Sequence, residues 1–230
     1  MNVQLLRYTL NPEYVAGLAA GLCYDAASPE RAFDSAMEGH HESVIEHTAF
    51  TFVIEGVSRS LLAQLTRHRI ASFSVQSQRY VSMKDKFEYV VPPRIKELGI
   101  LHESEFEKQM KQIHEWYCEW QETLRNAGYK GESANEDARY VLPNAACTRL
   151  MLTMNARELR HFFELRTCNR AQWEIRELAD EMLKLCKKVA PVLFEGAGCG
   201  CVSGHCPEGR RSCGKPRYES EWDSDVPCEE

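Results

Sequence analysis

The sequence has no long hydrophobic run. An example of its longer apolar stretches is residues 189–194, Val-Ala-Pro-Val-Leu-Phe. This length is far short of the roughly 20 residues that a membrane-spanning helix needs. Residues 1–7 contain no basic segment that leads into a long apolar one, which argues against a secretory signal. We therefore expect no membrane span and a cytoplasmic location.

An excess of positive charge is also missing. The 230 residues include 28 Lys and Arg against 34 Asp and Glu, a net charge of −6. General nucleic-acid binders need a basic face for phosphates, and single-strand binders interleave it with aromatic side chains. Nucleic acid is therefore not an expected partner. A hydrophobic fraction of 43% in a chain of this length is typical of one globular domain.

The cysteines fall into two groups. Half of the ten are scattered through apolar or helical-looking sequence and are interpreted as small core residues: Cys23, Cys118, Cys147, Cys168 and Cys186. The others follow Glu195, where the composition shifts to Gly, Pro, Cys and charge without periodicity. We predict one domain over residues 1–195 and a Cys/Gly-rich, loop-like tail over residues 196–230.

The tail permits more than one interpretation. Zinc could be bound by a set of thiol and imidazole side chains: Cys199, Cys201, His205, Cys206 and Cys213. Their spacing is not that of paired Cys-x-x-Cys knuckles, and a flexible reduced tail or an inter-subunit disulfide are alternatives. Cys228 stands alone. We assign no metal ligand.

Hydrophobic periodicity predicts both strands and helices. Apolar residues at every second position predict strands over residues 48–54, ended by Gly56, and around 150–154. Apolar residues at helical spacing predict two short helices within 11–37, and further helices over 58–65, 103–126, 157–168 and 171–190. Ser58 and Asn155 stand where helix caps belong. In the helix predicted over residues 103–126, the apolar stripe includes either Trp116 or Tyr117, followed by Trp120. The periodicity alone shows that strands and long helices both occur.

The densest functional signal lies in residues 67–80. It contains Arg67-His68-Arg69, followed after seven residues by Ser77 and then by Arg79. Arginine forks and hydroxyl groups match phosphate oxygens, so these residues indicate a phosphate-bearing ligand. A solvated basic turn is the alternative for the Arg-His-Arg triplet alone.

With two further segments, this spacing resembles the flavin-dependent thymidylate synthases. Residues 155–166, Asn-Ala-Arg-Glu-Leu-Arg-His-Phe-Phe-Glu-Leu-Arg, with 171–176 look like that family's second ligand-binding helix. Residues 41–47, His-Glu-Ser-Val-Ile-Glu-His, are similar to the segment before its first strand. They begin like a zinc-protease motif, but Ile45 stands where its second histidine belongs. The resemblance covers Glu38 to Ala190.

The resemblance implies a fold and a reaction. The fold class is α+β: a mixed core in which long helices flank a small, mainly antiparallel sheet, assembled as a homotetramer with active sites shared between subunits. The reaction converts dUMP to dTMP, with 5,10-methylenetetrahydrofolate as the one-carbon donor and FAD, reduced by NADPH, as the hydride source. Tetrahydrofolate is the other product.

The resemblance also implies a role for individual residues. The flavin would be contacted by Ser43, Glu46, Arg67, His68, Arg69, Val75, Asn155, Arg157 and His161, with Ser43 and Glu46 supplied by a neighbouring chain. The nucleotide would be contacted by Gln64, Leu65, Thr66, Arg67, Val75, Gln76, Ser77, Gln78, Arg79, Arg139 and Arg166.

Arg166 is the predicted catalytic residue. A guanidinium stays protonated, so it can stabilise negative charge on the uracil ring without donating its own proton. Its alternative role is a surface ion pair with Glu164 or Glu174. Two positions depart from the family's pattern: Val75 stands where Glu or Gln is common, and Arg170 replaces a different polar residue. The alternative function is a nucleotide-binding or zinc-tail regulatory protein without turnover.

Overall fold

The computed structural model describes residues 1–85 and 87–223, so Cys228 and the end of the tail lie outside the described residues. The chain forms two compact units, which are described separately. Unit 1 comprises Met1–Asn2, Glu55–Ala63 and Ser74–Leu150; unit 2 comprises Val3–Ile54, Gln64–Phe73 and Met151–Glu230. The predicted division at Glu195 stays a prediction.

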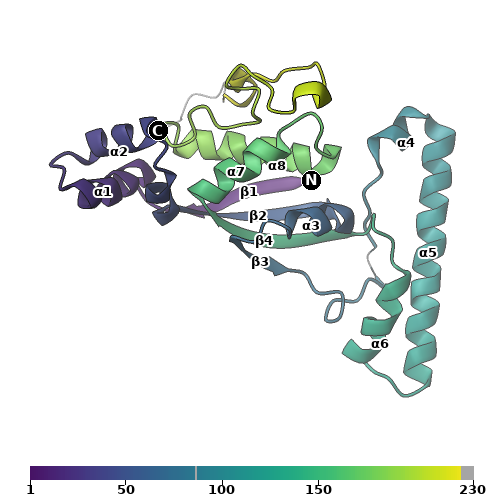
Figure 1. The fold of residues 1–230 in the computed structure, drawn as a ribbon. Helices are drawn as coiled ribbons and strands as arrows, with labels where there is room; N and C mark the ends of the chain where they lie inside the picture. The colour runs from purple at the N-terminus through teal and green to yellow at the C-terminus, as the bar shows by residue number, and fades with distance from the viewer. Residues whose placement is uncertain (86, 224–230) are drawn as a thin grey trace, which may run out of the picture. The chain divides into compact units, whose positions relative to one another are not determined.

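One four-stranded sheet confirms the α+β prediction. Its strands are β1 (Asn2–Tyr8), β2 (Ala49–Ser58), β3 (Ala71–Val75) and β4 (Cys147–Asn155), in the order β1-β2-β4-β3 (Figure 1). The alternation in β2 and β4 buries Phe50, Phe52 and Leu152 completely, as expected for strands with one face in a core.

The prediction that Gly56 ends the strand over residues 48–54, which is β2, is wrong. β2 continues to Ser58, with Val57 fully buried. Gly56 adopts a φ of 69° within the strand, a conformation that costs glycine little because it has no Cβ. The glycine therefore marks a local irregularity and the chain stays paired beyond it.

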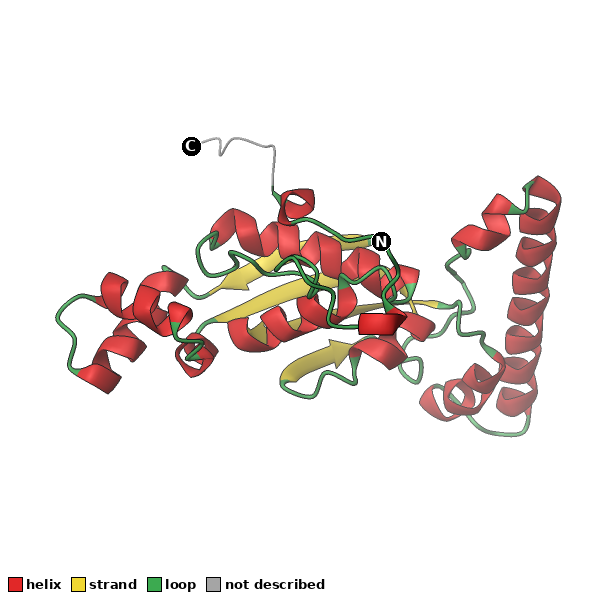
Figure 2. Cartoon of the chain, turned by 45° about the horizontal axis from the view of Figure 1, so that its top comes forward, coloured by secondary structure: helices red, strands yellow, loops and turns green. Residues whose placement is uncertain are grey.

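Helices of unit 2 cover one face of the sheet. α7 (Ala156–Arg166) and α8 (Trp173–Val189) lie over it in both views (Figures 1 and 2). Their apolar stripes bury Leu159, Phe162 and Leu178, and each such side chain contributes roughly 1.5–3 kcal/mol by leaving water. The same unit contains α1 (Pro12–Tyr24), α2 (Pro29–Glu38) and the 3-10 helix η1 (Glu42–His47).

Unit 1 is built on one long helix, as the sequence predicts. α5 (Ile100–Asn126) packs with α4 (Pro93–Glu97), α6 (Glu132–Ala138) and the short η2 (Arg139–Val141). Tyr117, not Trp116, faces the core, and its hydroxyl accepts hydrogen bonds from Met83 N at 3.1 Å and Gln121 Nε2 at 2.9 Å. Trp120 is 52% exposed. Its predicted place in the packed stripe is wrong because buried Gln121 faces inward instead.

Both predicted caps begin their helices. Ser58 Oγ accepts the Leu61 N–H at 3.0 Å at the start of α3 (Arg59–Leu65). Asn155 Oδ1 accepts the Glu158 N–H at 2.9 Å at the start of α7. These bonds satisfy amides that have no partner within the helix.

The described tail, residues 196–223, contains the 3-10 helices η3 (Gly209–Arg211) and η4 (Glu219–Trp222) but neither strand nor α-helix. Trp222 is fully buried and donates its Nε1–H to Asp180 on α8 at 2.8 Å. Arg217 binds the same carboxylate at 2.7 Å and lies 4.5 Å from the Trp222 ring. These contacts attach the tail to α8.

Candidate functional site

A buried hydrogen-bonded group lies along α7 in unit 2. Its centre is His68, which follows α3 and is only 5% exposed. His68 Nδ1 lies 3.3 Å from Glu158 Oε1 in the first turn of α7. At the other end of that helix, Arg166 Nε donates to His68 Nε2 at 3.1 Å. The Phe162 ring packs edge-on against the imidazole at 5.0 Å.

Burial shifts the pKa values of the ionisable side chains in this group. Burial lowers the pKa of His68 to about 4, and the positive charges of Arg166 and His161 act in the same direction. His68 is therefore a neutral imidazole at neutral pH. Burial raises the pKa of Glu158, against a smaller lowering by His161. Burial also lowers the pKa of Arg166, reinforced by Arg67, from a value high enough to leave the guanidinium charged.

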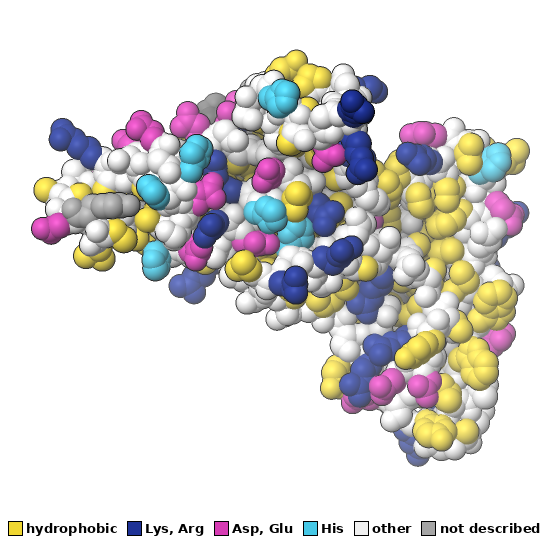
Figure 3. Space-filling model, in the orientation of Figure 1, with side chains coloured by type: hydrophobic (Ala, Val, Ile, Leu, Met, Phe, Trp, Pro, Cys, Tyr) yellow, Lys and Arg dark blue, Asp and Glu magenta, His cyan; other side chains and the backbone are white. Residues whose placement is uncertain are grey.

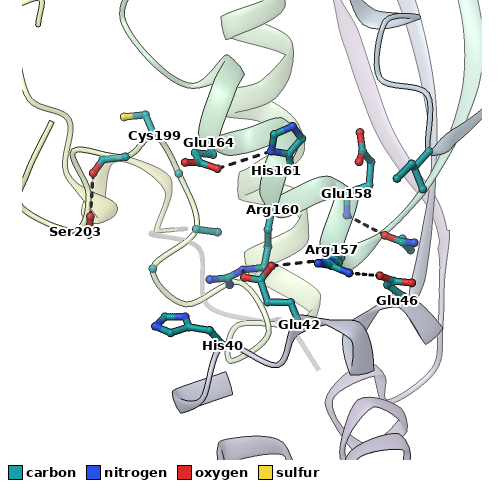
Figure 4. Close-up of a pocket in the computed structure, with 16 residues that line it drawn as sticks. His40, Glu42, Glu46, Arg157, Glu158, Arg160, His161, Glu164, Cys199 and Ser203 are labelled. Carbon is teal, nitrogen blue, oxygen red and sulfur yellow. Dashed lines mark hydrogen bonds and ion pairs between the residues drawn. The ribbon is translucent and has the colours of Figure 1, made fainter. Parts of the chain in front are cut away.

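A cavity of about 760 Å³ in unit 2 lies beside the start of α7. Figure 4 shows Arg157 pointing toward Glu46, with which it forms a hydrogen-bonded ion pair. Glu42 lies 3.9 Å from both Arg157 and Arg160. Asn155 and His161 also line the cavity, so it brings together four of the predicted flavin residues. Ser43 is exposed and is not among the residues that line it.

The tail supplies the other wall of this cavity. Residues 196–200, Gly-Ala-Gly-Cys-Gly, line it together with Ser203. Arg160 on α7 holds the residues that directly precede this loop. It donates hydrogen bonds to Leu193 O at 2.9 Å and Glu195 O at 3.1 Å. The Gly196 N–H donates to Glu219 Oε1 at 2.8 Å. The tail is therefore part of the pocket wall.

The predicted nucleotide residues of unit 1 form a separate group. Ser77 Oγ accepts the Arg79 N–H at 3.2 Å. Arg79 pairs with Glu132 and, at 3.2 Å, with Glu136 of α6. Arg139 Nε donates to the Glu136 carbonyl at 3.1 Å. Two predicted ligand arginines are thus held at one short helix.

Two buried donors in this group lack partners. Within the described residues, neither Gln78 Nε2 nor Arg79 Nε has a hydrogen-bond acceptor. A buried polar group without a partner costs about 1–3 kcal/mol, so an acceptor supplied by a ligand would stabilise both. Gln76 lines a second cavity, of about 380 Å³, in the same unit.

The remaining predicted residues differ in exposure. The side chain of Leu65 is completely buried and belongs to the core, so only its backbone is available to a ligand. Thr66, Arg67 and Arg69 are exposed after α3, whereas Gln64 and Val75 are half-buried. Neither cavity described above is lined by these residues.

The tail thiols do not form a preassembled metal site. Across residues 1–85 and 87–223, no three His, Cys, Asp or Glu side chains are placed to hold one metal ion. Cys199 Sγ and Cys201 Sγ lie 3.2 Å apart. Burial raises the pKa of Cys199 to about 12, helped by Cys201, so its thiol is protonated and unreactive at neutral pH. None of the helices in the described ranges has the length and apolar character needed to cross a membrane.

Comparisons with known proteins match this arrangement to one family. A family model described as "Thymidylate synthase complementing protein" matches residues 4–192. The flavin-dependent thymidylate synthase of Clostridium tetani is 48% identical, and that of Geobacter sulfurreducens 49% identical; each alignment covers 94% of both chains. The chain belongs to the flavin-dependent thymidylate synthases.

A solved structure supports the same fold. The flavin-dependent thymidylate synthase ThyX from Helicobacter pylori, complexed with FAD and dUMP, is 27% identical to this chain with a TM-score of 0.60. The match covers 86% of this chain and 100% of that one. In this flavin-dependent thymidylate synthase, the α+β fold predicted from the sequence is confirmed.

Sequence reasoning missed several residues of the site. Glu158 follows Asn155 at the spacing of a helix-capping pair, which hides its contact with His68. Arg160 lies between recognised positions, and its contacts are to the distant carbonyls of residues 193 and 195. The glycine-rich loop at 196–200 falls within the predicted loop-like tail. Its composition was the available signal, because glycines allow backbone to approach a ligand closely.

Proposed function

We propose that this flavin-dependent thymidylate synthase converts dUMP to dTMP with 5,10-methylenetetrahydrofolate as the one-carbon donor. FAD, when bound, supplies the hydride that completes the methyl group, and NADPH reduces it. We further propose a cytoplasmic homotetramer, in which neighbouring chains share residues such as Ser43 and Glu46.

The cavity of unit 2 is the proposed flavin site. At about 760 Å³ it falls in the size range of small-molecule and cofactor sites. Asn155, Arg157 and His161 offer donors from one end of α7, and the glycine-rich loop offers backbone. Arg157 is paired with Glu46, so an anionic group that binds Arg157 must compete with that carboxylate.

The group in unit 1 is the proposed binding site for the nucleotide. The unpartnered donors of Gln78 and Arg79 fit an acceptor-rich ligand. A phosphate would replace Glu132 and Glu136 as the acceptor for the Arg79 guanidinium, which favours bidentate contact with oxyanions. The hydroxyl of Ser77 is a ligand for the nucleotide. No covalent step requires it, and no base beside it is found among the described residues.

Arg166 has the proposed catalytic role. Its guanidinium is held at the end of α7 by a neutral histidine, so its positive charge is not cancelled there by a carboxylate. The charge stabilises the negative charge that develops on the uracil ring. This uncompensated, oriented guanidinium is the observation that carries the proposal, and it disfavours the ion-pair alternative with Glu164 or Glu174.

An absorbance spectrum of the purified protein tests the function first. We expect flavin bands that bleach under anaerobic NADPH, and bleach faster when dUMP is present. Formation of dTMP from dUMP and 5,10-methylenetetrahydrofolate should follow. A protein that cannot be reconstituted with FAD would contradict the proposal and favour the regulatory nucleotide-binding alternative.

A further inference from the structure

Glu158 has no assigned role, yet its position is unusual. It is one of two buried carboxylate residues in the described part of the chain, at 8% exposure. Its backbone N–H donates to the Asn155 cap, so the residue occupies the position from which a glutamate commonly caps the helix start. Its carboxylate instead reaches His68 on another segment.

The hydrogen bond from Arg166 determines which nitrogen of His68 carries the proton. Arg166 Nε–H can only donate, so the His68 Nε2 that it contacts must be an unprotonated acceptor. A neutral imidazole carries its single proton on the other nitrogen. That nitrogen, Nδ1, faces Glu158 Oε1 at 3.3 Å. The carboxylate therefore faces the protonated nitrogen of this tautomer at ion-pair distance.

We propose that Glu158 is a positioning residue that fixes the His68 tautomer, so that the Nε2 lone pair holds Arg166 in its catalytic orientation. The inference rests on the function proposed above. Without Glu158, the Nδ1–H would lose the carboxylate that faces it, and the tautomer protonated at Nε2 would place two donors face to face at Arg166. The guanidinium would then move away from its position.

The geometry leaves the terminal nitrogens of Arg166 available to contact the substrate. Only its Nε takes part in the bond to His68, and within the described residues no hydrogen bond or ion pair involves its terminal nitrogens. The chain of contacts from Glu158 through His68 to Arg166 spans the length of α7. A displacement of about 1 Å at a catalytic group can reduce a rate about 100-fold.

Steady-state kinetics on matched variants of the holoenzyme test the proposal. We expect Glu158→Leu to lower kcat by roughly 10-fold to 100-fold, with little change in the KM for dUMP or in FAD content. Glu158→Gln keeps an acceptor for Nδ1–H and should stay within about fivefold of the parent kcat. Glu177→Leu, at an exposed position on α8, should change nothing.

A direct readout separates positioning from general destabilisation. Solid-state ¹⁵N NMR of histidine-labelled protein, with His68 assigned by difference from His68→Asn, should show protonated Nδ1 in the parent and a large Nε2–H population in Glu158→Leu. If Glu158→Leu does not fold, Glu158→Asp replaces it, with an intermediate loss of kcat expected from its shorter reach.

Each outcome decides between the two proposals. A parent protein with the Nε2–H tautomer, or a Glu158→Leu variant with parental kcat, overturns the role of Glu158. Loss of kcat in Glu158→Gln equal to that in Glu158→Leu also overturns it, because the acceptor is retained. A parent protein without dTMP formation contradicts the proposed function, whereas the NMR measurement still tests the tautomer because it needs no turnover.

Discussion

Arg166 and His68 show how single side chains acquire a chemical role from burial. The pKa of His68 is lowered to about 4 mainly by burial, so the imidazole accepts a hydrogen bond and adds no positive charge beside Arg166. A carboxylate in its place would neutralise the guanidinium. A neutral acceptor orients the cation and preserves its charge for the substrate.

Replacement of Arg166 by alanine should separate binding from catalysis. We expect Arg166→Ala to fold and to retain FAD, because Arg166 is hydrogen-bonded to His68 and is not among the residues that line the cavity. Turnover should fall about 100-fold to 1000-fold, the usual cost of removing one preorganised charge-stabilising donor. FAD absorbance and kcat measure the two effects. Arg125→Ala, at an exposed arginine near the end of α5, is the control; equal loss of FAD in Arg166→Ala would contradict the role.

His68 should also make stability depend on pH. Its folded pKa of about 4 lies below the ordinary value of 6.5, so between these values the unfolded chain binds a proton that the folded chain excludes. Stability is therefore lost as pH falls through this window, by about 3 kcal/mol at most. The raised pKa of Glu158 acts in the opposite direction.

Urea unfolding at pH 7.5 and 4.5 checks this expectation. The parent protein should lose about 2 kcal/mol more between the two pH values than His68→Asn, which cannot titrate at this position. An equal loss in both proteins would show that His68 is not held neutral in the folded state.

At the scale of secondary structure, local patterns carried most of the information. The long stripe of α5 and the caps at Ser58 and Asn155 are properties of neighbouring residues, and the structure confirms them. β1 and β3 are not predictable from local patterns, because none of their residues is fully buried and the strands that they pair with are distant in sequence. Residues 71–75 also carry the binding motif, whose polar side chains obscure a strand pattern.

Within the tail, Gly198 packs closely against two other tail residues. Gly198 has a φ of 144°, and a Cβ there would lie 2.9 Å from both Trp222 Cζ3 and Val202 Cγ2. Gly204 also has a positive φ, of 91°, but faces open space. The two glycines therefore differ in crowding, while both have a backbone conformation that disfavours other residues.

Substitution of these two glycines tests whether the tail supports the flavin site. Gly198→Ala should displace the Trp222 ring and cost about 1–3 kcal/mol by overpacking, in addition to the backbone strain that Gly204→Ala shares. Because residues 196–200 line the cavity, Gly198→Ala should also weaken FAD binding more than Gly204→Ala. Tryptophan fluorescence, urea unfolding and FAD titration measure these effects. Equal FAD affinity in the two variants would exclude the tail from the flavin site.

At the scale of the whole molecule, the sequence predicts which types of residue form the candidate site. It does not predict which side chains those residues contact. The motifs indicate a cation-rich phosphate site, yet Arg157 and Arg79 are each paired with carboxylates. These carboxylates lie far from the arginines in sequence, so no local spacing reveals them. The proposed site residues also fall into two units, which the motif alone could not show.

Exposed apolar side chains support the proposed homotetramer. On α5, Ile100 is 74% exposed, Leu101 81%, Trp116 48% and Trp120 52%. Figure 3 shows hydrophobic side chains gathered over this helix. Apolar side chains gathered on a surface mark contacts with other molecules more often than free surface, and a second copy of the chain is the partner that the family resemblance implies.

Negative charges introduced on α5 should dissociate the homotetramer and, at the same time, release FAD from its binding sites. With 26.4 kDa per chain, sedimentation of the parent should give about 106 kDa, four times the mass of one chain. Trp116→Glu with Trp120→Glu places two like charges one helical turn apart on this face, and we expect smaller species that have lost FAD. Lys111→Glu, which changes the charge of α5 by the same amount at an exposed position, should stay assembled. Dissociated chains that keep FAD would show that the flavin site lies within one chain, and an intact tetramer would exclude α5 from the subunit contact.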